Sequence, residues 1–226
     1  RNWPIEDIAE LSKIDIWFLR EIEKSFNVNP ESTPTTILKM LGWTDEDLDN
    51  KDSKKELENN RVYKLVDTCS AEFESKTPYL YSTNGTSNDD TATKQKKVVV
   101  IGSGPNRIGQ GIEFDYCCVH GVSSLKENGY EAIMINSNPE TVSTDYDTAD
   151  KLYFEPLSWN EVKSVLDREK PDSVIIQLGG QTPLKLAKEI HNAGFNIAGS
   201  SLDVIDSTED RDLFQKLCTS QDIKKP

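Results

Sequence analysis

The chain has 226 residues, and its 39 acidic side chains outnumber 26 basic ones to give a formal net charge of −13. This acidic excess argues against general binding to nucleic acid, because proteins that grip the phosphate backbone present a basic face. The length suits one large domain or two small ones. No apolar run approaches the roughly 18 residues that cross a bilayer, so we expect a cytoplasmic protein with no membrane contact.

The first residue and the cysteines carry further expectations. Arg1 stands where a native start would carry Met, so we expect an internal cut here, and no signal peptide opens the chain. The four cysteines are Cys69, Cys117, Cys118 and Cys218. None has the spacing of a metal site, and their apolar neighbours predict reduced, mostly buried thiols that bind no metal.

Residues 1–81 have the pattern of a small, mostly helical domain with polar insertions. Within residues 5–26, apolar side chains recur at spacings of three and four, which predicts one amphipathic helix. This stripe consists of Ile5, Ile8, Leu11, Ile14, Phe18, Ile22 and Phe26. A weaker helical pattern covers residues 35–48. The polar stretches 27–36 and 49–60 predict solvated connectors or disordered insertions.

Two non-helical stretches follow. Residues 62–81 mix apolar and aromatic side chains without a clean period, which indicates an extended segment laid over the surface of another domain. Residues 82–97 are rich in Ser, Thr, Asn, Asp and Lys, a composition typical of a linker. We therefore expect the domain boundary within residues 82–97.

Short apolar strands alternate with helices through residues 98–208. Strands are expected at 98–101, 132–135, 152–154, 174–177 and 196–198. Helices are expected at 111–128, 158–168, 181–193 and 209–217, the last within a separate final segment, 209–226. The alternation predicts an α/β domain with a Rossmann-like parallel sheet and helices on both faces.

A glycine-rich turn, residues 102–111, follows the first of these strands, and its backbone can turn tightly and approach a ligand. A dinucleotide-binding turn would place a third glycine where Arg107 stands and an acidic residue where Asn136 ends the next strand. Both departures disfavour an NAD-dependent oxidoreductase. Two interpretations stay open: a purely structural turn, or a site where the Arg107 guanidinium meets a small oxyanion.

Further polar segments belong to the same end of the predicted sheet. Glu113 and Asp115 open a helix, where they complement its dipole or, for Glu113, face the crevice and partner Arg107 or a substrate. The loops 138–147 and 179–183 follow two other strands, and their side chains favour a turn-forming structural role. Because the carboxyl ends of parallel strands share one edge, these segments mark where an open α/β sheet binds ligands.

Five motifs in order make the sequence specific. They are Gly104 to Cys118, Ser137 to Asp147, Leu152 to Pro156, Gly179 to Pro183 and Glu209 to Arg211. Together they resemble the large chains of carbamoyl-phosphate synthetases, and the first two resemble the second, carbamate-phosphorylating half of those chains. Residues 11–19 and 63–73 are similar to the end of the helical oligomerisation domain between the halves, although residues 27–60 depart from that family's pattern.

This resemblance implies a ligase that makes carbamoyl phosphate from bicarbonate, ammonia and ATP, with Mg²⁺ bridging the phosphates. It places a pre-ATP-grasp domain at residues 98–208 and the start of an ATP-grasp domain at 209–226. No catalytic or metal-binding residue is then expected in the segment, which would be inactive alone. The resemblance assigns Arg211 to nucleotide binding. It assigns Arg107, Gly111 and Glu113, called here the passage wall, to an internal passage for carbamate.

The resemblance also implies partners. These are the ATP-grasp domain and first synthetase half of the same chain, a glutaminase subunit or domain that supplies ammonia, and further copies in a homo-oligomer. Pyrimidine and arginine biosynthesis are both open as the pathway. The alternative from a different class is a non-catalytic assembly module whose helical region mediates association, and one chain can hold both roles.

Overall fold

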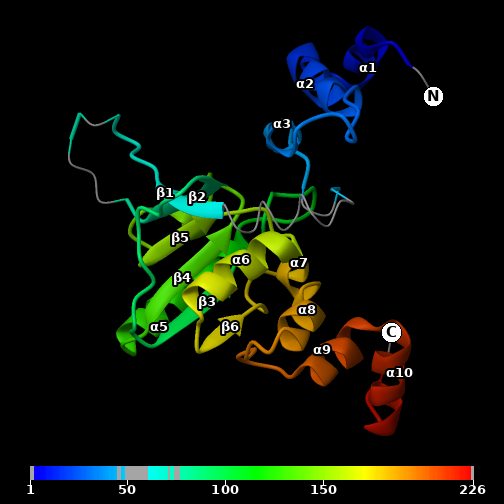
Figure 1. The fold of residues 1–226 in the computed structure, drawn as a ribbon. Coiled ribbons are helices and arrows are strands. Elements are labelled where there is room, and N and C mark those ends of the chain that lie inside the picture. Colours follow the sequence, from blue (N-terminus) through cyan, green and yellow to red (C-terminus); the bar gives the residue numbers. More distant parts are fainter. Residues whose placement is uncertain (1–2, 45–46, 49–60, 71, 74–76, 225–226) are drawn as a thin grey trace. The chain divides into compact units, whose positions relative to one another are not determined.

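A computed structural model of the chain describes residues 3–44, 47–48, 61–70, 72–73 and 77–224 (Figure 1). The chain divides into two compact units, residues 1–60 and 61–226. This division differs from the boundary expected within residues 82–97. The reason is that β1 (Arg61–Leu65), which precedes that stretch, and β2 (Tyr79–Asn84), which runs into it, belong to the sheet of the second unit.

The first unit begins with α1 (Ile5–Ser12) and α2 (Ile16–Phe26), so the expectation of one continuous helix was wrong. Lys13 adopts a left-handed conformation with φ 60° and donates its N–H to the carbonyl of Ala9, which ends α1. The Asp15 carboxylate accepts a hydrogen bond from the N–H of Trp17 at 2.8 Å and caps the start of α2. These two local caps interrupt a stripe whose spacing alone predicted continuity.

The apolar stripe of this unit is not a buried face, since no residue of α1 or α2 is buried. A third helix, α3 (Thr35–Met40), is shorter than the helix expected over residues 35–48. A small core joins Leu38 and Leu48 to Val28 and Trp43. The polar insertion expected at residues 49–60 lies outside the described residues.

The second unit is built on a six-stranded sheet with the order β1-β2-β5-β4-β3-β6. Its strands are β1 (Arg61–Leu65), β2 (Tyr79–Asn84), β3 (Lys97–Ile101), β4 (Glu131–Asn136), β5 (Lys151–Phe154) and β6 (Ser173–Ile175). Only β1 and β2 pair antiparallel, and the other neighbours pair parallel. The expected α/β class is confirmed, with a Rossmann-like, mostly parallel sheet that a helical segment precedes in the sequence.

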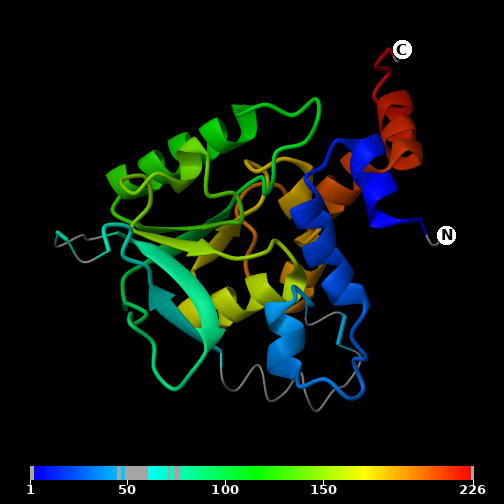
Figure 2. The same cartoon turned by 90° about the horizontal axis from the view of Figure 1, so that it is seen from above.

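The sheet separates two apolar cores, and helices cover both of its faces (Figure 2). The remaining elements are α5 (Glu113–Glu127), η1 (Val142–Thr144), α6 (Trp159–Glu169), α7 (Gln181–Leu184), α8 (Ala187–Asn192), α9 (Leu202–Glu209) and α10 (Arg211–Ser220). Alternation along β3 sends Val100 into the core under α5, and Val99 and Ile101 into the core under α6 and α8. Each face of β3 is therefore buried, as its continuous apolar run predicted.

Several expected elements differ in extent. The helix expected at 181–193 is broken into α7 and α8, and the strand expected at 196–198 is reduced to one bridge between Ile197 and Val174. The expected helix at 209–217 starts at Arg211, because the Asp210 side chain accepts the N–H of Leu213 at 2.9 Å and caps it.

The strands β1 and β2 correct the expectation for residues 62–81. This stretch does not lie over another domain, because β2 pairs with β5 and β1 pairs with β2 in the same sheet. Tyr63 and Leu80 lie in the core of that sheet, and Tyr63 packs edge-on against Tyr153 at a ring separation of 4.9 Å. The partner strand lies some seventy residues further along the chain, so local periodicity could not reveal the pairing.

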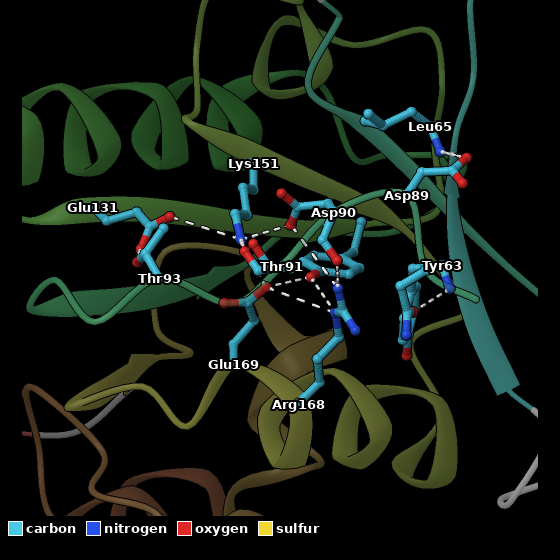
Figure 3. A network of polar contacts seen from close by, with 12 residues as sticks. Tyr63, Leu65, Asp89, Asp90, Thr91, Thr93, Glu131, Lys151, Arg168 and Glu169 are labelled. Carbon is cyan, nitrogen blue, oxygen red and sulfur yellow. Dashed lines mark hydrogen bonds and ion pairs between the residues drawn. The ribbon is translucent and has the colours of Figure 1, made fainter.

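The stretch expected as a linker, residues 82–97, begins in β2 and ends in β3, and its segment from Asp90 to Thr93 lies against the amino ends of the strands (Figure 3). Its carbonyl groups accept hydrogen bonds from buried cations: Lys97 Nζ binds the carbonyl of Thr93 at 2.9 Å, and Lys151 Nζ binds that of Thr91 at 3.0 Å. Arg168 donates to the carbonyl of Asp90. A stretch with the composition of a flexible linker is thereby fixed on the domain.

Carboxylates neutralise these cations in the same buried network (Figure 3). Glu169 lies 3.0 Å from Lys97 Nζ and 3.1 Å from Lys151 Nζ, and its side chain is fully buried. The Asp90 carboxylate lies 2.7 Å from Lys151 Nζ. Buried charges persist only when they are compensated, and each of these cations has a carboxylate partner, with Glu131 as a further acid 3.5 Å from Lys97 Nζ.

The cysteines and the membrane expectation can be set against the described residues. All four cysteines are free thiols, but only Cys118 and Cys218 are buried, while Cys69 is half-buried and Cys117 is exposed. The expectation of mostly buried thiols therefore holds for two of them. Within the described ranges, every helix is too short or too polar to span a bilayer.

Candidate functional site at the carboxyl ends of the strands

The glycine-rich turn after β3 is closed by the protein itself. The N–H of Gly102 donates to the carbonyl of Ile135 at 2.8 Å. The next two N–H groups donate to side chains: Ser103 to Asp115 Oδ1 at 3.3 Å, and Gly104 to Asn136 Oδ1 at 3.0 Å. In a nucleotide-binding turn such groups point toward the pyrophosphate. Here they are occupied, which is a second, structural reason to disfavour a dinucleotide site.

Asp115, in the first turn of α5, is the centre of this arrangement. Its carboxylate accepts hydrogen bonds from Ser103 Oγ at 2.8 Å, Thr141 Oγ1 at 2.8 Å, Ser143 Oγ at 3.1 Å and Asn136 Nδ2 at 3.2 Å, in addition to the Ser103 N–H. Only 2% of Asp115 is exposed. One buried carboxylate therefore joins the turn after β3, the end of β4 and the loop that contains η1.

Asn136 occupies the position where a dinucleotide fold would carry its acidic residue. It is fully buried at the end of β4, and its Oδ1 accepts the N–H groups of Gly104 and, at 2.9 Å, of Ser137. Its Nδ2 donates to both Asp115 and Ser143. An amide can donate and accept at once, which a carboxylate in this position could not do. The side chain of Asn136 thus stabilises the turn by hydrogen bonds, whereas the acidic residue of a dinucleotide fold would bind a ribose hydroxyl.

The passage wall occupies the exposed part of the same turn. Arg107 Nη2 donates to Thr182 Oγ1 at 3.1 Å, and Glu113 Oε1 accepts the N–H of Gly111 at 3.3 Å. The expected pairing of Arg107 with Glu113 is not formed, because each side chain has its own neighbour. All three residues of the passage wall are exposed, so a guanidinium, a carboxylate and a bare backbone face solvent at this edge.

Gly111 leaves room for the Glu113 carboxylate. A Cβ atom at position 111 would lie 2.5 Å from Glu113 Oε2, which is closer than real contacts allow. The clash involves the end of a flexible side chain, so a substitution would displace the carboxylate rather than the backbone. The absence of a side chain at Gly111 therefore sets the position of Glu113.

Arg211 lies apart from the passage wall in sequence and in element. It is the first residue of α10, directly after the capping residue Asp210, and it is exposed. The structure leaves its guanidinium accessible at a helix N-terminus. Its role in nucleotide binding stays a prediction, as do the roles of the three passage-wall residues.

Glu155 is a further buried acid at the carboxyl end of β5. Its Oε1 accepts the N–H of Ser82 at 3.0 Å, which joins β5 to β2, and only 2% of the residue is exposed. Burial raises the pKa of Glu155 to about 7, opposed by the hydrogen bond from Ser82 and the charge of Arg61. The motif that contains this residue was recognised from the sequence, but the direction of its pKa shift follows from its burial in the fold.

Two features bear on the chemistry available at this edge, namely metal-ligand clusters and thiols. In the described ranges, no three or more His, Cys, Asp and Glu side chains gather as a metal site. Burial raises the pKa of the Cys118 thiol, and the nearby Asp115 carboxylate raises it further, so Cys118 is a poor nucleophile. At the exposed part of the edge, the guanidinium of Arg107 offers hydrogen-bond donors that suit a small anion.

Sequence reasoning missed Asp115 and Asn136 as the residues that hold this edge. Asp115 was assigned to the helix dipole, and Asn136 was noted only as the absence of an acid. The available signal was a Ser or Thr cluster after one strand together with an Asp in the first turn of the preceding helix. Such clusters are common in loops, so the link between Asp115 and Thr141, 26 residues apart, needed the fold.

The sheet order and the closed turn together define an α/β domain whose carboxyl edge carries exposed charged side chains. A family model for the carbamoyl phosphate synthase preATP-grasp domain matches residues 94–207, about half of the chain. The chain belongs to this family.

Curated relatives extend the similarity to the whole chain. The carbamoyl phosphate synthase large chain of Archaeoglobus fulgidus is 47% identical over 100% of this chain and 23% of its own length. The large chains of Thermotoga neapolitana and Deinococcus radiodurans are 48% and 46% identical, over 98% and 100% of this chain. The chain thus spans less than a quarter of the length of these relatives.

Proposed function

We propose that these residues form the pre-ATP-grasp domain, with the end of the preceding helical domain, in the second half of a carbamoyl phosphate synthase large chain. The whole protein would make carbamoyl phosphate from bicarbonate, ATP and ammonia. The observation that carries the proposal is the identity of 47% along the full chain, while the chain accounts for only 23% of the relative. The exposed carboxyl edge fits a supporting role beside a separate catalytic domain.

Within this proposal the residues have different tasks. Arg107, Gly111 and Glu113 line a passage for carbamate, and Arg211 contacts the nucleotide phosphates. ATP and Mg²⁺ would be held mainly by an ATP-grasp domain, and phosphoryl transfer would depend on positioning and charge neutralisation there. No residue of the segment acts as a catalytic group.

The proposal for the whole protein extends to its partners and setting. The complete synthetase works in the cytoplasm, where this segment functions with the first synthetase half of the same chain. A glutaminase subunit or domain supplies the ammonia. The product feeds pyrimidine or arginine biosynthesis. These partners and this pathway belong to the complete synthetase, and the family membership of this segment supports them.

The passage can be tested in the full-length synthetase with Gly111→Phe. A bulky ring at this position narrows the passage, so ATP hydrolysis should continue while carbamoyl phosphate formed per ATP falls severalfold. Glu127→Phe adds the same ring at an exposed position at the other end of α5 and serves as the control. An unchanged ratio in Gly111→Phe would remove Gly111 from the passage.

The fragment itself offers a second, independent measurement. If the ATP site lies mainly outside residues 1–226, calorimetry on this chain should detect no tight, Mg²⁺-dependent binding of ATP. Tight binding by the fragment would contradict the assignment of the nucleotide site to another domain. This test does not depend on the enzymatic activity of the whole protein.

A role in assembly is supported by the helical unit. Its helices α1 and α2 expose large apolar side chains, among them Leu11 at 69%, Trp17 at 59%, Phe18 at 57% and Phe26 at 80%. Exposed apolar patches of this kind mark interaction sites. Sedimentation of the 226-residue chain should show concentration-dependent association that the double variant Trp17→Ser, Phe18→Ser abolishes. A wild-type chain that stays monomeric would exclude this role for the fragment.

A further inference from the structure

We propose that Asp115 is a positioning residue for the carbamate passage: it fixes both ends of the loop that carries the passage wall. The inference deepens the proposed function and rests on it. Asp115 touches no substrate, because it is buried, and it acts through the residues that it binds.

The first support is the chemistry of the carboxylate. Asp115 is buried, yet across the described residues no Lys or Arg lies within ion-pair distance of it. A buried carboxylate without a cation is costly unless hydrogen bonds replace its hydration. Its five donors supply them, and the first turn of the 15-residue α5 adds a favourable dipole.

The set of donors explains why an acid stands here. All five partners present hydrogens to Asp115, and a carboxylate offers two oxygens with about four lone-pair sites and no competing donor. An asparagine would turn an N–H₂ group toward some of these donors. At least one buried donor would then lose its partner, and the loops would have to separate.

The second support is the position of the anchors relative to the passage wall. One anchor is at Ser103 and Gly104, held by Asp115 and by Asn136, and the other is Asp115 itself at the start of α5. The whole passage wall lies between them. Between Gly104 and Asp115 the hydrogen bonds are few and exposed. The anchors at the two ends of this segment therefore determine the conformation of its backbone.

A third support is the connection to the loop after β4. Thr141 and Ser143 donate to opposite oxygens of the same carboxylate, so this loop cannot shift without moving Asp115. The loop after β4 and the turn after β3 are neighbours at the carboxyl edge, since β3 and β4 pair directly. Asp115 therefore couples the position of the loop after β4 to that of the turn after β3.

The test is Asp115→Asn in the full-length synthetase, with ATP hydrolysis and carbamoyl phosphate measured together. A misplaced passage wall should lower carbamoyl phosphate formed per ATP at least threefold, with the KM for ATP unchanged within about twofold, because the nucleotide site is elsewhere. Thr141→Val and Ser143→Ala each remove one donor and leave the carboxylate in place. They should lower the same ratio by a smaller factor, and they remain informative if Asp115→Asn does not fold.

Glu169→Gln is the matched control, since Glu169 is also a buried carboxylate but lies at the amino ends of the same strands. It should lower the melting temperature at least as much as Asp115→Asn and leave the ratio unchanged. An unchanged ratio in all three carboxyl-edge variants, or an equal fall in Glu169→Gln, would reduce Asp115 to a structural residue. A wild-type protein that forms no carbamoyl phosphate would instead overturn the proposed function, which keeps the two failures distinct.

Discussion

Arg107 Nη2 donates a hydrogen bond to Thr182 Oγ1 over 3.1 Å, and this contact joins the turn after β3 to helix α7. Both residues belong to motifs recognised in the sequence, but 75 residues separate them in the chain. The contact is exposed, whereas the hydrogen bonds to Asp115 from Ser103 and Asn136 are buried. The loop that carries the passage wall is thus anchored at its ends by the buried Asp115, and Arg107 within it is tied to Thr182.

We expect Thr182→Ala to loosen this turn without unfolding the domain. An exposed hydrogen bond contributes about 1 kcal/mol or less, so the free energy of unfolding should change little. Hydrogen–deuterium exchange of the amides at 106–111 should become faster, because the hydrogen bond that restrains this turn is lost. Thr208→Ala is the control, since that hydroxyl bonds only to its own helix, at the carbonyls of Val204 and Ile205. Unchanged exchange in Thr182→Ala would show that the contact does not restrain the turn.

Glu155 should make stability fall as the pH rises from about 5 to 8. Its folded pKa is raised from 4.5 to about 7, so its contribution is fully present below the unfolded pKa and is lost as the pH rises through 7. The difference in pKa corresponds to at most about 3 kcal/mol. Glu155→Gln keeps an oxygen for the Ser82 N–H but cannot ionise. Urea titrations of the chain at several pH values should show a flatter pH profile for the variant, and parallel profiles would contradict the raised pKa.

The buried network at the amino edge should be far more sensitive than a surface ion pair. Glu169→Gln removes the nearer of the two carboxylates that Lys97 and Lys151 share, the other being Glu131, and should cost about 3 kcal/mol in the free energy of unfolding. Asp167→Asn removes the partner of Lys163 on the exposed face of α6 and should cost less than about 0.5 kcal/mol. Chemical denaturation of both variants measures the difference, and equal losses would refute the distinction.

The same glutamate gives a pH dependence of the opposite sign to that of Glu155. Burial would raise the pKa of Glu169, but the hydrogen bonds from Tyr153 and Lys97 and the charge of Lys151 hold it below the usual 4.5. Its stabilisation is therefore present above pH 4.5 and is lost as the pH falls through the lower folded value. In acid, the denaturation midpoints of the wild type and Glu169→Gln should converge.

Gly179 should tolerate no side chain, for reasons of space rather than backbone angle. An added Cβ would lie 2.5 Å from the carbonyl oxygen of Ile101 and 2.6 Å from that of Gly102, both rigid backbone atoms. Gly179→Ala should therefore cost about 2 to 3 kcal/mol by forcing the two turns apart. Gly194→Ala is the comparison, because that position has φ 85° and open space, and its cost should be about 1 kcal/mol. Thermal melts that rank the two variants in the reverse order would contradict this account.

The sequence by itself determined the features that depend on neighbours along the chain. The apolar run of β3, the glycines that follow it and the alternation of strands with helices predicted an α/β fold with a functional carboxyl edge. The ordered motifs identified the family. These signals are local, because a strand that is buried on both faces must be apolar throughout and a tight turn must contain glycine.

Only the tertiary structure decided the features built from residues distant in sequence. The pairing of β2 with β5, the fixing of residues 82–97 by Lys97, Lys151 and Arg168, and the five hydrogen bonds to Asp115 all join segments that no local pattern connects. A polar side chain has the same sequence signature whether it faces water or closes a buried network. Its partners, and hence its burial and its pKa, exist only once the chain has brought those segments together.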